Sequence, residues 1–209
     1  MRPRQFALKA PFYTWAGKPA AGSYPVGQSV FITDVGGWNG TTHSGSFWFS
    51  NGTLWRPVSG VLMLAASVAS VASTNTASEQ TLYSYTLQGG VMAPGDSLRV
   101  TAKYNYAGSA GVTIRNRYGG QEFAGNPGVS YGLGIIQHVL NNRATSTQVA
   151  SILSAAASVS SLNAGLGSTQ ISTISVDSSA DQAIALTMQK TTASDSMSLE
   201  SVLIELLAR

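Results

Sequence analysis

The second half of the chain is dominated by alternation of apolar and polar residues. In residues 97–106, five apolar positions (Leu98, Val100, Ala102, Tyr104 and Tyr106) alternate with Arg99, Thr101, Lys103 and Asn105. A period of two residues is that of a half-buried strand. With the same criteria the sequence predicts strands at 81–87, 97–106, 111–118, 135–143, 147–154, 169–177, 182–190 and 198–207. Eight short strands separated by turns predict an eight-stranded, jelly-roll-like β-sandwich over residues 79–209.

Two aromatic-rich runs, 46–50 and 53–57, flank Asn51 and Gly52. Asn-Gly between such runs indicates a β-hairpin, because a two-residue type I′ turn requires positive φ at both positions. We expect Trp48 and Trp55 to come close to pairing across it. An isolated hairpin is marginal in water, so its aromatic side chains need cover from the rest of the chain or from sister chains.

The start of the chain combines turn residues with large apolar side chains. Residues 1–28 hold four prolines and three glycines, which disfavour regular structure. Phe6, Phe12, Tyr13 and Trp15 are nevertheless too apolar for a free tail. We therefore expect an extended N-terminal arm that is docked on another surface.

The chain then divides into an arm and Trp-rich hairpin module at 1–62, a junction at 63–78 and the sandwich at 79–209. In the junction, apolar residues stand at helical spacing, but its small residues also allow an extended chain. A glycine-rich stretch, 119–134, reads as a loop between strands. Residues 150–164 are read as strand, with a helix as the alternative. The apolar ending at 202–207 indicates a buried last strand or a subunit contact.

Composition narrows the class of protein. Only 10% of residues are charged, against about 25% in a typical soluble domain. The sequence holds 29 Ser, 18 Thr and 22 Gly, which favours an extracellular or particle-bound protein over a cytosolic enzyme. There is no cysteine, so disulfides and thiolate chemistry are excluded.

Charge and hydropathy argue against two kinds of partner, nucleic acid and a membrane. The net charge of +3 is too small and too scattered for specific nucleic-acid binding, and no apolar run is long enough for a membrane span. Arg2, Arg4, Lys9 and Lys18 precede the first acid, Asp34. This basic arm either contacts an acidic partner or is a solvated terminus.

No motif predicts catalysis, a metal site or a cofactor. The nine acids fall mostly in turns and at strand ends, and none forms a close pair in sequence. His43 in a loop and His138 in a strand have no clustered partners of the kind a metal requires. Five tyrosines in the predicted strands either fill a core or interface, or stack on sugar rings. We expect a protein that is not an enzyme.

Residues 30–36 and 45–58 resemble a short module of tailed-phage virion proteins. There, a hydrophobic strand, Thr-Asp and a glycine loop lead to Trp-x-Ser-Asn-Gly-Thr-x-Trp-Arg-Pro, as at Trp48 to Pro57 here. Such modules precede fibre-like or jelly-roll domains in head-decoration and tail-fibre proteins. The resemblance covers about 30 residues by motif and implies no catalytic residue.

The resemblance implies a structural protein on the surface of a phage particle. The first hypothesis is a capsid decoration (cement) or head-fibre protein bound to the major capsid protein or other virion proteins. The alternatives are a tail-fibre or receptor-binding module that contacts host glycans, and a carbohydrate-active enzyme on a jelly roll. We expect Arg2, Arg4, Phe6, Phe12, Tyr13 and Trp15 to anchor the chain. Phe31, Trp48, Trp55 and Leu206 are expected at the interface of a homotrimer.

Overall fold

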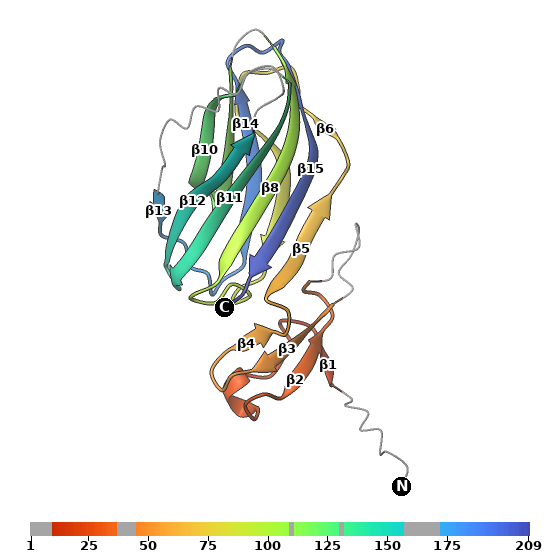
Figure 1. Cartoon of the computed structure of the whole chain (residues 1–209), viewed down its shortest axis with the longest axis vertical. Helices are drawn as coiled ribbons and strands as arrows, with labels where there is room; N and C mark the ends of the chain where they lie inside the picture. Colours follow the sequence, from red (N-terminus) through yellow and green to blue (C-terminus); the bar gives the residue numbers. More distant parts are fainter. Residues whose placement is uncertain (1–9, 37–44, 109–110, 130–131, 157–171) are drawn as a thin grey trace.

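The computed structural model describes residues 10–36, 45–108, 111–129, 132–156 and 172–209, and it is all-β as the sequence predicts. Two sheets form a β-sandwich, and a small third sheet lies at one end of it, beside the C-terminus (Figure 1). Arg2, Arg4, Phe6 and His43 lie outside the described residues. Among the described residues, the one helical element is the single turn η1 (Ala21–Ser23).

The small sheet has the order β1-β2-β3-β4. Its strands are β1 (Phe12–Tyr13), β2 (Ser29–Ile32), β3 (Ser46–Ser50) and β4 (Trp55–Pro57). β1 runs parallel to β2, and the other pairs are antiparallel. The expected extended arm is therefore folded from Ala10 onward. Pro11 and Pro19 are accommodated because both lie outside the short ladder.

The hairpin is present, but its loop has four residues rather than two. Ser50 pairs with Trp55, and Trp48 pairs with Pro57, so the two tryptophans are not opposite each other. The Asn51 side-chain oxygen accepts hydrogen bonds from the backbone N–H groups of Thr53 and Leu54, at 3.0 and 2.8 Å. This side-chain cap closes a wider turn than the Asn-Gly pair predicts.

The sandwich consists of a seven-stranded and a four-stranded sheet. The larger has the order β13-β12-β11-β8-β15-β5, with β6 also on β15, and the smaller has the order β10-β9-β14-β7. The strands are β5 (Val61–Ser67), β6 (Val71–Ala72), β7 (Gln80–Leu87), β8 (Ser97–Ala107), β9 (Val112–Tyr118), β10 (Gln121–Val129), β11 (Gly132–Ala144), β12 (Thr147–Ala156), β13 (Ser172–Ile174), β14 (Gln182–Lys190) and β15 (Ser196–Leu207).

All eight strands expected in this region are present, and β10 is an addition. The stretch 119–134, expected to be a loop, contains β10 and the start of β11. Gly119 and Gly120 form the tight turn before β10, with φ of 54° and 79°. β10 pairs antiparallel with β9 through irregularities in register. The glycines therefore mark a turn and an irregular strand, not a long connection.

Two further stretches are now assigned. The expected junction 63–78 supplies most of β5 and all of β6, which extend the larger sheet. Residues 150–156 belong to strand β12 rather than to a helix, while 157–171 lie outside the described residues. The apolar C-terminal run is a central strand, because β15 lies between β8 and β5.

Eight of the sandwich strands share one pairing rule. In chain order they are β5, β7, β8, β9, β10, β11, β14 and β15. The first pairs with the last, the second with the seventh, the third with the sixth and the fourth with the fifth. β12 and β13 are added at one edge, beyond β11.

One apolar core runs through both parts of the molecule. Trp15, Trp48 and Ile32 of the small sheet belong to the same buried cluster as Leu87 and Met92 of the sandwich. A second cluster, which includes Tyr104 and Ile114, fills the other end of the sandwich. Shared burial of large side chains makes independent movement of the small sheet costly.

Candidate interaction surface

The outer face of the small sheet carries a row of apolar side chains, one each from β1, β2 and β3 and one from the residue after β4. Phe12 lies opposite Phe31, and Phe31 lies opposite Phe47. Val58, which directly follows β4, donates its backbone N–H to the Phe47 carbonyl at 2.9 Å and so continues the row. The strand register thus places four apolar side chains side by side, and we call Phe12, Phe31, Phe47 and Val58 the aromatic row.

The aromatic row is exposed but ordered. The ring centroids of Phe12 and Phe31 are 5.2 Å apart, and those of Phe31 and Phe47 are 4.9 Å apart. Phe12, Val58 and Phe47 are 72%, 61% and 51% exposed. Contiguous exposed apolar side chains on a sheet of this size are typical of an interaction site.

A groove of about 500 Å³ runs beside the row. Its lining includes Phe47 and Val58 of the row, together with Ala10 and Pro11. Ala10 is the first described residue. The groove and the row together form the candidate interaction surface.

Of the six residues expected to anchor the chain, the structure describes three. Arg2, Arg4 and Phe6 lie outside the described residues, and Phe12 belongs to the aromatic row. Tyr13 is half-buried, and its hydroxyl lies 2.9 Å from that of Tyr24. Trp15 is 5% exposed and donates its indole N–H to the Gly89 carbonyl, so it contacts the sandwich rather than an outside partner.

The four residues expected at an oligomer interface are mostly internal. Trp48 and Leu206 are completely buried within one chain, and Trp55 is 6% exposed. The Trp48 ring packs edge-on against Trp15, and the Trp55 indole donates to the Pro19 carbonyl at 2.8 Å. The chain itself therefore covers these side chains, which removes the physical reason for placing them between subunits. Phe31 is half-buried and lies in the aromatic row.

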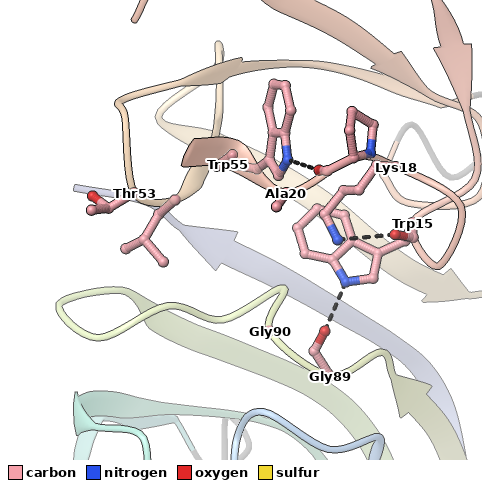
Figure 2. Close-up of a pocket in the computed structure, with 10 residues that line it drawn as sticks. Trp15, Lys18, Ala20, Thr53, Trp55, Gly89 and Gly90 are labelled. Carbon is pink, nitrogen blue, oxygen red and sulfur yellow. Dashed lines mark hydrogen bonds between the residues drawn. The ribbon is translucent and has the colours of Figure 1, made fainter. Parts of the chain in front are cut away.

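A second groove lies at the seam between the small sheet and the sandwich (Figure 2). It has a volume of about 470 Å³ and is lined by Trp15, Lys18, Trp55 and Gly89, among others. The Lys18 ammonium lies 3.6 Å from the Trp15 ring centroid and donates to the Trp15 carbonyl. Burial lowers the pKa of Lys18, against a smaller opposing effect of Asp34.

The polar groups of this seam already have partners inside the chain. Asp34 accepts the Trp15 backbone N–H at 2.7 Å and the Gln88 amide at 3.3 Å. Asp181 accepts the Gly89 backbone N–H at 2.8 Å. The Gln88–Asp34 bond, together with the Trp15–Gly89 bond, connects the two parts of the molecule. We therefore assign the seam to structure rather than to ligand binding.

The two parts are also joined by a buried ion pair that sequence reasoning missed. Arg56 of β4 donates two hydrogen bonds to Asp96, which precedes β8. Arg56 also donates to the Arg209 carbonyl, and the Arg209 N–H donates to Asp96. Arg56 and Asp96 are far apart in sequence, and no local sequence pattern predicts that they pair.

Of the two histidines in the sequence, the structure describes His138, which lies between the sheets of the sandwich. Its Nδ1 is 2.6 Å from the Asn116 side-chain nitrogen, and burial lowers its pKa to about 4. Its Nε2 has no hydrogen-bond partner among the described residues. Across all the residues that the structure describes, no group of three or more His, Cys, Asp or Glu could hold a metal ion.

The acidic residues of the four-stranded sheet form ion pairs on its outer face. Glu79 accepts two hydrogen bonds from Arg117, at 2.9 and 3.0 Å, and Glu122 lies 3.1 Å from Arg115. Opposite charges thus offset one another here. Within the described ranges, no helix is long and apolar enough to span a bilayer.

The chain matches no protein-family model and no curated protein. The aromatic row and the fold therefore carry the functional argument.

Proposed function

We propose that the chain is a non-enzymatic structural protein of a phage particle that binds the capsid shell through its small N-terminal sheet. The observation that carries the proposal is the aromatic row, which exposes Phe12, Phe47 and Val58 on a sheet whose opposite face is mostly buried. Rigid exposed aromatic side chains are the usual anchors of protein interfaces.

Charge supports the choice of a protein partner with an acidic rim. In the sequence, Arg2, Arg4 and Lys9 precede Ala10, which lines the groove, and the first acid is Asp34. Basic groups around an apolar patch steer it towards acidic surfaces and add specificity. An apolar row in a sheet that follows a basic segment of the sequence therefore fits a capsid surface of negative charge.

We also propose that the sandwich is a jelly roll. Pairing of the first strand with the last, the second with the seventh, the third with the sixth and the fourth with the fifth is what results when one long antiparallel ribbon is rolled up. On this assignment the domain begins with β5 at Val61 rather than at residue 79. β12 and β13 are then an insertion at its edge.

Particle labelling tests the virion assignment. Particles of the phage that encodes the chain are labelled with gold-conjugated antibody against residues 79–209 and imaged. Gold over the capsid is the expected result. Gold confined to the tail favours the alternative of a tail-fibre or receptor-binding module that contacts host glycans, and unlabelled particles overturn the proposal.

A binding assay tests the surface itself. Purified chain is added to particles that lack it, and the bound fraction is measured by co-sedimentation. The double variant Phe12→Ser/Phe47→Ser is expected to bind at least about tenfold more weakly, since truncated interface anchors typically cost more than 1 kcal/mol each. Ile135→Ser, which changes an exposed apolar residue on the outer face of β11, is the matched control. Equal binding by the double variant and the control contradicts the assignment of the row.

A further inference from the structure

A buried pair of polar side chains, His138 and Asn116, lies between the two sheets of the sandwich. His138 belongs to β11 of the larger sheet and Asn116 to β9 of the smaller sheet. Their exposed fractions are 0% and 1%, and His138 Nδ1 lies 2.6 Å from the Asn116 side-chain nitrogen, Nδ2. The pair therefore connects the two sheets through the interior and is shielded from bulk water.

The pair interrupts the apolar core at one level of the sandwich. On both strands, the residue two positions before the pair belongs to one buried cluster and the residue two positions after it belongs to the other: Ile114 and Ile136, then Tyr118 and Leu140. The boundary between the two apolar clusters therefore coincides with His138 and Asn116. Polar groups in such a place need a hydrogen-bond partner for each buried donor and acceptor.

The contact between the two side chains determines which ring nitrogen carries the proton. Burial lowers the pKa of His138 to about 4, so the ring is neutral at pH 7 and has a single N–H. The Asn116 Nδ2 group can only donate, and His138 Nδ1 must therefore accept. The ring proton is then on Nε2. Apart from the contact between them, the pair presents one ring donor, His138 Nε2–H, and one amide acceptor, Asn116 Oδ1.

This donor and this acceptor are both buried, and neither has a hydrogen-bond partner among the described residues. A buried donor or acceptor without a partner is destabilising, and folded proteins commonly satisfy such groups with an internal water, which needs space as well as polar partners. The neighbour of Asn116 across the ladder with β10 is Ala124, which is also buried. A one-carbon side chain at this position favours space beside the pair.

We propose that the interior of the sandwich binds one water molecule, which accepts a hydrogen bond from His138 Nε2–H and donates one to Asn116 Oδ1. Water supplies an acceptor and a donor in one small uncharged molecule, which is the complement of what the pair presents. A metal ion would require more ligands than this pair, and within the described ranges no group of three or more His, Cys, Asp or Glu could hold one. The donor and the acceptor together therefore select water as the ligand.

The bound water completes a polar connection between β11 and β9. Apolar contacts between two sheets tolerate small shifts, whereas a hydrogen-bonded chain of His138, water and Asn116 requires one relative position of the two strands. The water thus helps to fix how the two sheets face each other. The site lies inside the sandwich and is separate from the aromatic row, so it does not depend on the partner proposed for that row.

Nuclear magnetic resonance on the isotope-labelled wild-type chain tests the proposal at pH 7. The ring nitrogen shifts of His138 are expected to show that Nε2 carries the proton and Nδ1 does not. The carbon-bound ring protons Hδ2 and Hε1 flank Nε2, and they are expected to give water cross-peaks of opposite sign in NOESY and ROESY spectra. Opposite signs identify a bound water rather than proton exchange. A proton on Nδ1 instead of Nε2, or no such water cross-peak at either ring proton, overturns the proposal.

Two matched leucine substitutions assign the water to this pair. Asn116→Leu removes the acceptor at nearly constant side-chain volume and is expected to abolish the water cross-peaks of His138. Asn105→Leu makes the same change at an exposed position of β8 and is expected to retain them. Circular dichroism checks that both variants are folded. Cross-peaks that persist in folded Asn116→Leu would contradict the assigned site, and the wild-type spectra decide the proposal even where that variant does not fold.

Discussion

Arg56 and Asp96 form a buried, two-point ion pair that joins the small sheet to the sandwich. Arg56 Nη1 lies 2.9 Å from Asp96 Oδ2, and Nη2 lies 2.6 Å from Oδ1. The two side chains are 9% and 1% exposed. Parallel N–H bonds to one carboxylate fix the relative orientation of the groups as well as their distance, so this pair sets how the aromatic row is presented.

Loss of the Arg56 guanidinium is expected to be costly. Arg56→Leu leaves Asp96 with N–H bonds from Ala93 and Arg209 but without a counter-ion. An uncompensated buried charge typically lowers the free energy of unfolding by about 3–5 kcal/mol. Urea denaturation followed by tryptophan fluorescence measures the change.

Arg99 offers the control for that experiment. It pairs with Glu205 at 2.7 Å, but its side chain is 30% exposed. Arg99→Ala is expected to cost about 1 kcal/mol or less, because water screens a partly exposed pair. Equal losses for the two substitutions would contradict the role given to burial.

The two faces of β3 provide a second contrast. Trp48 is completely buried, whereas its neighbour Phe47 is 51% exposed on the opposite face. Trp48→Ala is expected to destabilise the chain by about 3–5 kcal/mol through lost burial and an unfilled cavity. Phe47→Ala loses one edge-on contact with Phe31 and is expected to cost about 1 kcal/mol. Thermal unfolding measures both, and similar losses would contradict the assigned faces.

How far the sequence predicts this structure depends on how local each signal is. Strand β8 is foreseen from alternation alone, because side chains on opposite faces of a strand differ in burial. The aromatic row is missed because it requires β1 to pair with β2 in parallel, at a separation of nearly 20 residues. Phe47 is the one local clue, since alternation with buried Trp48 places it on the outer face.

Other features escape the sequence for equally physical reasons. The glycines of 119–134 indicate a loop, yet the ladder with β9 makes a strand of β10. Burial of Trp48 depends on the packing of Trp15, and the Arg56–Asp96 pair joins two segments that only the fold brings together. Long-range contacts of this kind have no period in the sequence.

His138 predicts that the sandwich loses stability as the pH falls. Burial favours the neutral ring, so the folded chain binds the proton with a pKa of about 4, against about 6.5 for an exposed histidine. The unfolded chain therefore binds more protons between these values. The free energy of unfolding should decrease from about pH 6.5 down to about pH 4, by roughly 3 kcal/mol in total.

The pH dependence is assigned by comparing two proteins. Urea unfolding of the wild type and of His138→Gln is measured at several values between pH 7 and pH 5, above the range in which most carboxylates titrate. The wild type is expected to lose stability on acidification, and the variant is expected to show a flatter curve, whatever its stability at pH 7. Parallel curves would show that another group titrates.

Lys190 predicts a local effect on the segment that precedes β7. Its ammonium donates to the carbonyls of Thr74, Ala193 and Asp195, at 2.8, 2.7 and 2.6 Å, and the residue is 3% exposed. Lys190→Met leaves these carbonyls without their donor, which is expected to cost about 2 kcal/mol or more. Hydrogen exchange should accelerate at the amides of Ser73 and Thr74, because the segment before β7 loses its attachment to β14. Lys103→Met, at an exposed position of β8, is the control. Unchanged exchange in Lys190→Met would mean that other contacts hold this segment in place.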